Sequence, residues 1–422
     1  MRRFLLLVVL LSVVTSVAWS LDASVGIEDP LDTIDAAVDA LEQSWVGRFD
    51  MDWDAFVSDI WGAASMSRGL DSAIEVGDTL DPAGVVEYIV QRLQSHFGDL
   101  HAAFYAAEEI ARAEAVSSQF VADFEAGRAT SDGFSPCGGI VEENVAYVWI
   151  PPTSDSGAGL LAPDYIWAKG MELLDVVESL DENGPRGWVI DLRQHLGGSY
   201  QVGLIGLQSF LPEGRLFGFV YPPQLSELFL VHAWIEHRGR EFLWTYHDLQ
   251  FMQTKSVIVD VSEHALSLRN PDAPIAVLTS SWTASAAEMM LVALRQNPRV
   301  RTFGEPTSGV STDRDGFALP DGSRLVFSSG YLADPDGHVY HDPSMTGYQA
   351  YLSFGGSFCV SGEPVQPDVP AYVPRWGDVA HEAEKMATLG PQAFLETWYD
   401  PAYRAALAWI DEQAEQSPAT DP

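Results

Sequence analysis

The sequence predicts an α/β (α+β) fold in which helices cover a mixed sheet and a helical subdomain precedes it. Short apolar runs typical of buried strands alternate with helical patterns through the middle of the chain. Such alternation favours a parallel or mixed sheet. The expected elements are the strands Ala146–Ile150, Gly187–Leu192, Pro274–Thr279 and Arg299–Phe303, and the helices Asp164–Leu180, one from about Val202, and Ala284–Arg295.

Helical spacing dominates the chain before this core. Ile34, Ala37, Val38 and Leu41 fall on one helical face, and the same spacing returns within residues 85–93. A further helix is expected between Glu108 and Gly127. The expected division is a signal peptide at 1–20, a helical region at 21–130, a core at 131–380 with insertions near 219–260 and 341–361, and a C-terminal helical tail at 381–422.

The first twenty residues have the pattern of an export signal. A basic start, Met1-Arg2-Arg3, precedes the apolar run Phe4–Val17, and small residues follow at a cleavage site after Ser20. The apolar run is short for a membrane span, although an uncleaved anchor is the alternative. We therefore expect a secreted or periplasmic (cell envelope) protein without stable membrane insertion after cleavage.

Composition narrows the choice of partners. The 422 residues carry a formal net charge of -37, which would repel a nucleic-acid backbone and disfavours anionic membranes. The acidity could attract basic peptides, or it could serve solubility or a salty environment. Cys137 and Cys359 are an even pair in a chain with an export pattern, so one disulfide could form between them. The sequence does not indicate an oligomeric state.

A serine at a strand-to-helix junction is the first candidate for chemistry. The predicted strand ending at Thr279 leads into Thr283-Ala284-Ser285-Ala286-Ala287-Glu288, where the next helix begins. Backbone N–H groups at a helix start can stabilise an anion formed beside Ser285. The alternative is an ordinary helix-capping serine.

Glycine-containing turns follow two other predicted strands. Asp191-Leu192-Arg193 leads to Gly197-Gly198, and Gly304-Glu305-Pro306-Thr307-Ser308-Gly309 follows the strand after the serine helix. With the serine segment, these blocks resemble the S41 serine peptidases, the family of the carboxyl-terminal processing proteases and the tricorn core protease. Weaker matches are Asp52-Trp53-Asp54, Asp99-Leu100-His101, Gly138-Gly139-Ile140, Val145–Ile150 and Pro367-Asp368-Val369, so the resemblance covers roughly residues 31–373.

The resemblance implies a crotonase/Clp-protease-like core and a nucleophile at Ser285. Processing proteases of the family place a lysine just after the second glycine turn, but this chain has Val310 there. The region between the helices and the core also leaves no room for a PDZ domain. Both features favour the tricorn-like branch, in which the residue matching His101 is the general base. Neutral imidazole can accept the serine proton and return it to the leaving group.

The same resemblance suggests the remaining site residues. Backbone N–H groups of Ala286 and of Gly197 or Gly198 would form the oxyanion hole. A family glutamate orients the base, and here the nearest carboxylate is Glu363, with Ser361 at the aligned position. Asp99 is a further candidate for that role, and His195 replaces a family asparagine in the first glycine turn.

Other chemistries have little support in the sequence, and we expect no cofactor and no metal. Residues 157–162 spell a dinucleotide fingerprint but do not follow a strand, and the pairs His338/His341 and His232/His237 lack zinc-site context. The expected function is therefore an exported serine peptidase that hydrolyses peptide or protein substrates. The alternatives are a non-catalytic ligand-binding member of the same fold and an esterase that uses the same serine.

Overall fold

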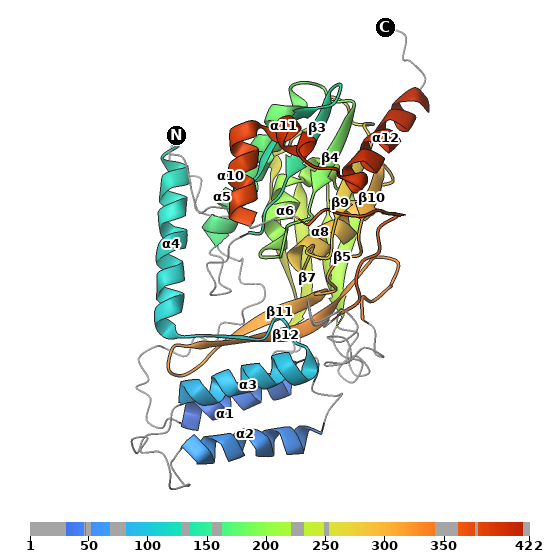
Figure 1. Ribbon diagram of the computed structural model, residues 1–422. Coiled ribbons are helices and arrows are strands. Elements are labelled where there is room, and N and C mark those ends of the chain that lie inside the picture. Colours follow the sequence, from blue (N-terminus) through green and yellow to red (C-terminus); the bar gives the residue numbers. More distant parts are fainter. Residues whose placement is uncertain are drawn as a thin grey trace.

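The computed structural model describes residues 31–45, 47, 52–67, 82–127, 135–153, 163–220, 232–248, 253–341, 362–375 and 379–416. The predicted signal peptide, the dinucleotide-like stretch 157–162, Cys359 and Ser361 lie outside these residues. So does nearly all of the expected insertion at 341–361. The described chain forms two sheets with helices around them (Figure 1).

The first sheet contains the strands predicted for the core. Its order is β13-β10-β9-β4-β3-β2, and every neighbouring pair is parallel except the β2/β3 hairpin. Every residue of β3, β4 and β9 is buried, as expected for central strands covered on both faces. The bounds are β2 Cys137–Val141, β3 Val145–Trp149, β4 Gly187–Asp191, β9 Ile275–Thr279, β10 Val300–Gly304 and β13 Val369–Pro370.

Alternate residues of these strands pack against helices on opposite faces, because successive strand side chains point in opposite directions. Val148, Ile190 and Val277 share a core with α5, α6 and α8, whereas Val189 and Leu278 face α10, α11 and α12. The predicted α+β core is confirmed. The bounds are α5 Pro163–Asp181, α6 Tyr200–Gly206, α8 Ala286–Arg295, α10 Val379–Leu389, α11 Pro391–Glu396 and α12 Pro401–Gln416.

The second sheet is antiparallel and its extent was not predicted. Its order is β1-β12-β5-β6-β7-β8, and β11 also pairs with β12. The stretch 219–260, interpreted from the sequence as an insertion or lid, contributes hairpins that extend this sheet. The bounds are β1 Ala103–Tyr105, β5 Gly214–Val220, β6 His232–His237, β7 Glu241–Asp248, β8 Gln253–Asp260, β11 Thr312–Ala318 and β12 Arg324–Ala333, with short 3-10 helices at Gln208–Phe210 and Ser262–His264.

The N-terminal helices lie against β11 and β12, at the foot of the view in Figure 1. Ile34 and Leu41 from α1 and Ile89 from α3 share a hydrophobic cluster with Leu325 and Phe327 from β12. This helical layer brings the turn after α3 to the second sheet. No helix in the described ranges combines the length and apolarity needed to cross a membrane. The bounds are α1 Leu31–Ser44, α2 Trp53–Ser67, α3 Pro82–Phe97 and α4 Ala107–Glu125.

Candidate active site

Ser285 lies in a strained turn between β9 and α8. Its backbone dihedrals are φ 52° and ψ -117°, outside the regions that residues with a Cβ normally adopt. Strain of this kind costs on the order of 1–3 kcal/mol and persists only where surrounding contacts impose it. The turn holds Ser285 immediately before the first N–H groups of α8. The predicted helix begins two residues later than expected, which leaves the serine outside it.

Glu288 holds this turn from inside the protein. Its fully buried carboxylate accepts the Ser285 N–H at 2.8 Å, the Gly309 N–H at 2.9 Å and the Thr307 hydroxyl at 2.5 Å. It therefore ties the serine turn to the second glycine turn. Burial raises the pKa of Glu288 to about 7, although the donated hydrogen bonds oppose this. Our sequence reasoning assigned Glu288 no role, but the spacing Ser-x-x-Glu at a helix start was a usable signal.

His101 contacts Ser285 across 184 residues of sequence. It lies in the turn between α3 and β1, and its Nε2 is 2.9 Å from Ser285 Oγ. The imidazole is 9% exposed. Burial, and to a smaller extent the nearby Arg314 charge, lowers the pKa of His101 to about 3. The ring is therefore neutral near pH 7, the form that can accept a proton.

The other ring nitrogen of His101 faces hydroxyl groups. Its Nδ1 is 2.7 Å from Thr312 Oγ1 on β11 and 3.5 Å from Ser328 Oγ on β12. A register shift at Asp313/Arg314 accompanies this arrangement, since such a bulge redirects neighbouring side chains. Our sequence reasoning missed Thr312 and Ser328, because their position depends on strand pairing and no local motif marks them.

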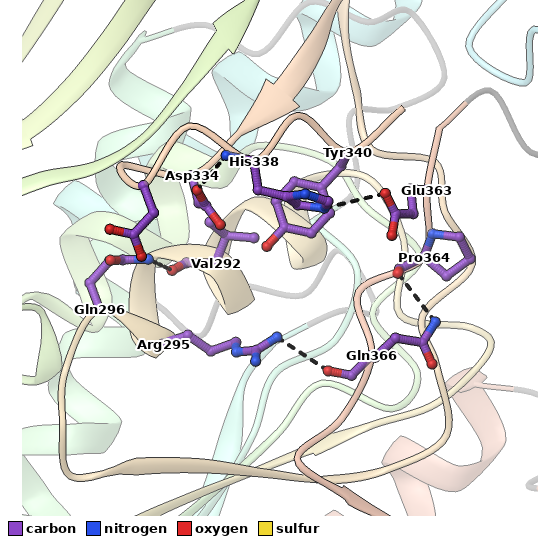
Figure 2. A pocket seen from close by; sticks show the side chains of 10 residues that line it. Val292, Arg295, Gln296, Asp334, His338, Tyr340, Glu363, Pro364 and Gln366 are labelled. Carbon is purple, nitrogen blue, oxygen red and sulfur yellow. Dashed lines mark hydrogen bonds and ion pairs between the residues drawn. The ribbon is translucent and has the colours of Figure 1, made fainter. Parts of the chain in front are cut away.

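Glu363 is placed away from the base. Its carboxylate pairs with His338 at 3.2 Å. Both residues line a separate pocket of about 380 Å³, and Figure 2 shows their side chains beside Tyr340. The structure thus gives His101 no contact with Glu363, and Ser361 lies outside the described residues. Glu363 therefore does not contact the imidazole directly, as the glutamate expected from the family resemblance would.

Asp99 shapes the turn that carries His101. Its Oδ1 accepts the backbone N–H groups of His101 at 3.0 Å and Ala102 at 3.2 Å, as in an Asx turn. Its Oδ2 accepts the Trp45 indole N–H at 2.9 Å. Burial raises the pKa of this carboxyl, and hydrogen bonds from Ser328, Trp45 and His101 oppose that effect.

The first glycine turn lies against the serine. Gly197 and Gly198 both have φ 120°, and a Cβ on Gly197 would stand 3.0 Å from Ser285 Cβ. The Gly197 N–H donates to His195 Nδ1 at 3.1 Å. The N–H groups of Gly198 and Ala286 donate no hydrogen bond within the described structure. Two unpaired backbone donors therefore flank the serine turn.

Buried polar contacts fix the two turns to each other. Ala284 N–H donates to the His195 carbonyl at 3.0 Å, and the Thr283 hydroxyl donates to the Leu192 carbonyl at 2.9 Å. Arg193, 1% exposed, forms ion pairs with Asp191 and with Asp400 at the start of α12. These contacts limit relative movement of the serine and the glycine donors.

Metal and sulfur chemistry are not indicated by the described geometry. No group of three or more His, Cys, Asp or Glu side chains within the described ranges is arranged to hold a metal ion. Cys137, at the start of β2, has its sulfur 3.4 Å from Met386 Sδ, and its proposed partner Cys359 lies outside those ranges.

The fold and the pairing of a serine with a buried imidazole have the geometry of a hydrolase. Residues 144–346 match the model of peptidase family S41. This part of the chain is similar to that family, and the match covers the serine turn, both glycine turns and β11 to β12.

Individual relatives are distant. The chain is 26% identical over 162 residues to the nisin-resistance protein of Lactococcus lactis subsp. lactis, covering 38% of this chain and 45% of that protein. It is 26% identical over 170 residues to the carboxyl-terminal-processing protease of Synechocystis sp., covering 40% of this chain and 32% of that protein. The matched region thus spans less than half of either relative.

A solved structure extends the likeness in fold to nearly the whole chain. The structure of a lipoprotein from Streptococcus agalactiae superimposes with a TM-score of 0.52 at 17% identity, covering 90% of this chain and 95% of that one. The likeness includes the arrangement of helices and sheets beyond the family match, and it concerns the fold alone.

Proposed function

We propose that the protein is an exported serine peptidase in which Ser285 is the nucleophile and His101 is the general base. The observation that carries this proposal is the distance of 2.9 Å between His101 Nε2 and Ser285 Oγ. The serine lies in a strained turn, and the buried imidazole is neutral near pH 7. Backbone strain on a chemically competent residue supports a functional role, because a capping serine has no need of it.

In the proposed reaction, Ser285 Oγ attacks the peptide carbonyl while His101 Nε2 takes the hydroxyl proton. The carbonyl oxygen becomes an oxyanion. His101 then returns the proton to the leaving amine as the C–N bond breaks, which leaves an acyl-enzyme. A water molecule, deprotonated by His101 in turn, attacks the acyl carbon and releases the carboxylic acid and Ser285.

The oxyanion would be bound by the N–H groups of Ala286 and Gly198. Both are unpaired, whereas the Gly197 N–H is engaged by His195. Gly197 contributes space instead, since any larger residue would press on Ser285. Donors of this kind are worth about 3–4 kcal/mol each in transition-state stabilisation.

Peptides or proteins are the proposed substrates, since residues 144–346 match the model of a peptidase family and a matched relative is named as a processing protease. The net charge of -37 favours basic over acidic substrates at low ionic strength. Secretion or attachment to the cell envelope follows from the export pattern at residues 1–20 and agrees with a lipoprotein as the structural neighbour.

Labelling with a fluorophosphonate probe tests the nucleophile. We expect folded wild-type protein to be modified on Ser285, as located by mass spectrometry, and Ser285→Ala and heat-denatured protein to remain unlabelled. His101→Gln should label slower by several orders of magnitude, because base and nucleophile act as a unit. Labelling of His101→Gln at the wild-type rate would contradict the assignment of the base.

Substrate profiling separates the remaining alternatives. Cleavage of a peptide library supports the peptidase, whereas turnover of activated esters alone supports the esterase. Absence of label in folded protein, together with binding of an apolar ligand, would favour a non-catalytic member of the fold.

A further inference from the structure

We propose that Asp99 is a positioning residue that sets the protonation state of His101 through a relay of two buried hydroxyls, Ser328 and Thr312. The inference rests on the proposed function, because it concerns the group that would activate Ser285. It replaces the direct carboxylate partner that Glu363 does not provide.

The strand register brings these groups together. β1 pairs antiparallel with β12, with Ala103 opposite Val326, and continuing that register by two residues places His101 opposite Ser328. Thr312 is opposite Tyr331 in the pairing of β11 with β12, and its side chain reaches Ser328 diagonally from the other side of β12. The chain of contacts is His101 Nδ1 to Thr312 Oγ1 at 2.7 Å, Thr312 Oγ1 to Ser328 Oγ at 2.9 Å, and Ser328 Oγ to Asp99 Oδ1 at 2.8 Å.

The hydrogen positions along the relay follow from the Asp99 carboxylate. An ionised carboxylate only accepts, so the Ser328 hydroxyl donates to Asp99. Ser328 Oγ must then accept the Thr312 hydrogen, and Thr312 Oγ1 must accept from His101 Nδ1. A neutral imidazole carries one hydrogen, so Nε2 is left bare and faces Ser285 Oγ. This is the tautomer that a general base requires.

The surroundings of Asp99 keep the direction of the relay. Its other partners are the Trp45 indole N–H and the backbone N–H groups of Ser328, His101 and Ala102, all of which can only donate. A protonated Asp99 could place its hydrogen only toward Ser328 Oγ. The relay would then reverse and put the imidazole hydrogen on Nε2, where it blocks proton transfer from the serine.

Because the relay residues are buried, water cannot replace them in orienting the His101 imidazole. Asp99 is 3% exposed, and Thr312 and Ser328 are fully buried. Water therefore does not compete for His101 Nδ1, and among the described residues the two hydroxyls are the side-chain groups within hydrogen-bond distance of it. When His101 takes the serine proton, the same chain connects the imidazolium to the buried negative charge.

Nitrogen NMR of the wild-type protein tests the tautomer directly. In protein labelled with 15N-histidine, His101, assigned by comparison with His101→Gln, should show a protonated Nδ1 and an unprotonated Nε2 at pH 7. A protonated Nε2 in the folded wild type would overturn the proposal. This measurement needs no enzymatic turnover, so it stands even if the proposed function fails.

Matched variants test the contribution of each hydroxyl. Thr312→Val interrupts the relay and Thr312→Ser keeps it, whereas Ser328→Ala disconnects Asp99 and leaves its Trp45 and backbone donors. We expect fluorophosphonate labelling of Ser285 to slow on the order of 10²-fold in Thr312→Val and Ser328→Ala, and to recover largely in Thr312→Ser, since tautomer control by a direct carboxylate is worth up to about 10⁴.

The outcomes distinguish the two proposals. If folded Thr312→Val and Ser328→Ala are labelled as fast as the wild-type protein, the proposed relay is wrong, whereas the peptidase assignment stands. Failure of wild type to label would count against the peptidase, and the NMR result would still decide the tautomer. Circular dichroism melting of each variant shows whether a slower rate comes from loss of folded protein.

Discussion

Replacing Ser285, the proposed nucleophile, by glycine should make the protein more stable than replacing it by alanine. Both variants lose the hydroxyl and its contact with His101, so the comparison isolates the backbone. Ser285 has φ 52° and ψ -117°, a conformation that alanine shares only under strain and glycine adopts freely. Its side chain is not needed for the turn, which Glu288 holds through the backbone N–H.

The expected difference can be worked from two opposing terms. Relief of the strained backbone contributes about 1–3 kcal/mol, and the larger conformational freedom of glycine in the unfolded chain offsets about 0.4–1 kcal/mol of that. The net effect is about 1 kcal/mol in favour of Ser285→Gly. At an unfolding entropy of about 2.1 cal/mol/K per residue, this corresponds for a chain of 422 residues to a rise in Tm of about 1 °C over Ser285→Ala.

Differential scanning calorimetry and urea unfolding of the two purified variants measure this difference. The pair Ser281→Gly and Ser281→Ala, at a neighbouring residue without positive φ, serves as a matched control in which glycine should be the less stable substitution. A Ser285→Gly variant no more stable than Ser285→Ala would refute the inference that the serine turn stores strain.

Three further predictions concern buried charge. Burial lowers the pKa of His101 from 6.5 to about 3, so the neutral imidazole contributes to the stability of the folded protein above pH 6.5, and this contribution is lost as the pH falls toward 3. For the same reason we expect the decrease of kcat/KM on the acid side of the pH profile to lie below pH 5. Burial raises the pKa of Glu288 from 4.5 to about 7, so the protonated carboxyl contributes to the free energy of unfolding below pH 4.5, and this contribution, at most about 3 kcal/mol, is lost as the pH rises through 7. Urea unfolding of Glu288→Gln should show no such decrease of the unfolding free energy between pH 4.5 and 7. Arg193→Met leaves two buried carboxylates unpaired and should cost about 3–5 kcal/mol, against less than about 1 kcal/mol for Arg186→Met at its exposed pair with Asp411.

The core could be predicted from local sequence, and Ser285 and His101 were selected from short motifs that resemble a peptidase family. Apolar runs identified β3, β4 and β9, because buried parallel strands need side chains that are apolar on both faces. Ser285 stood at a strand-to-helix junction, and His101 stood in a short motif. Each signal occupies only a few consecutive residues, and the structure places the two side chains in contact.

The partners of the imidazole could not be predicted, because no local pattern defines them. Thr312 and Ser328 lie in no recognised motif, and only the pairing of β1 and β11 with β12 brings them to His101. Glu363 was selected by its nearness to an aligned position, and the structure places it with His338 instead. Glu288 could have been found from its capping spacing to Ser285.

The proposed nucleophile, Ser285, and the proposed base, His101, are held by two different hydrophobic cores. The helix after Ser285 packs with the six-stranded sheet, whereas the helices before His101 pack with β12. Because the two clusters are separate, we expect loosening of the helical layer to withdraw the imidazole and leave the serine turn intact. Heat inactivation should accordingly begin at a lower temperature than global melting, and it should reverse on cooling as long as the larger core has stayed folded.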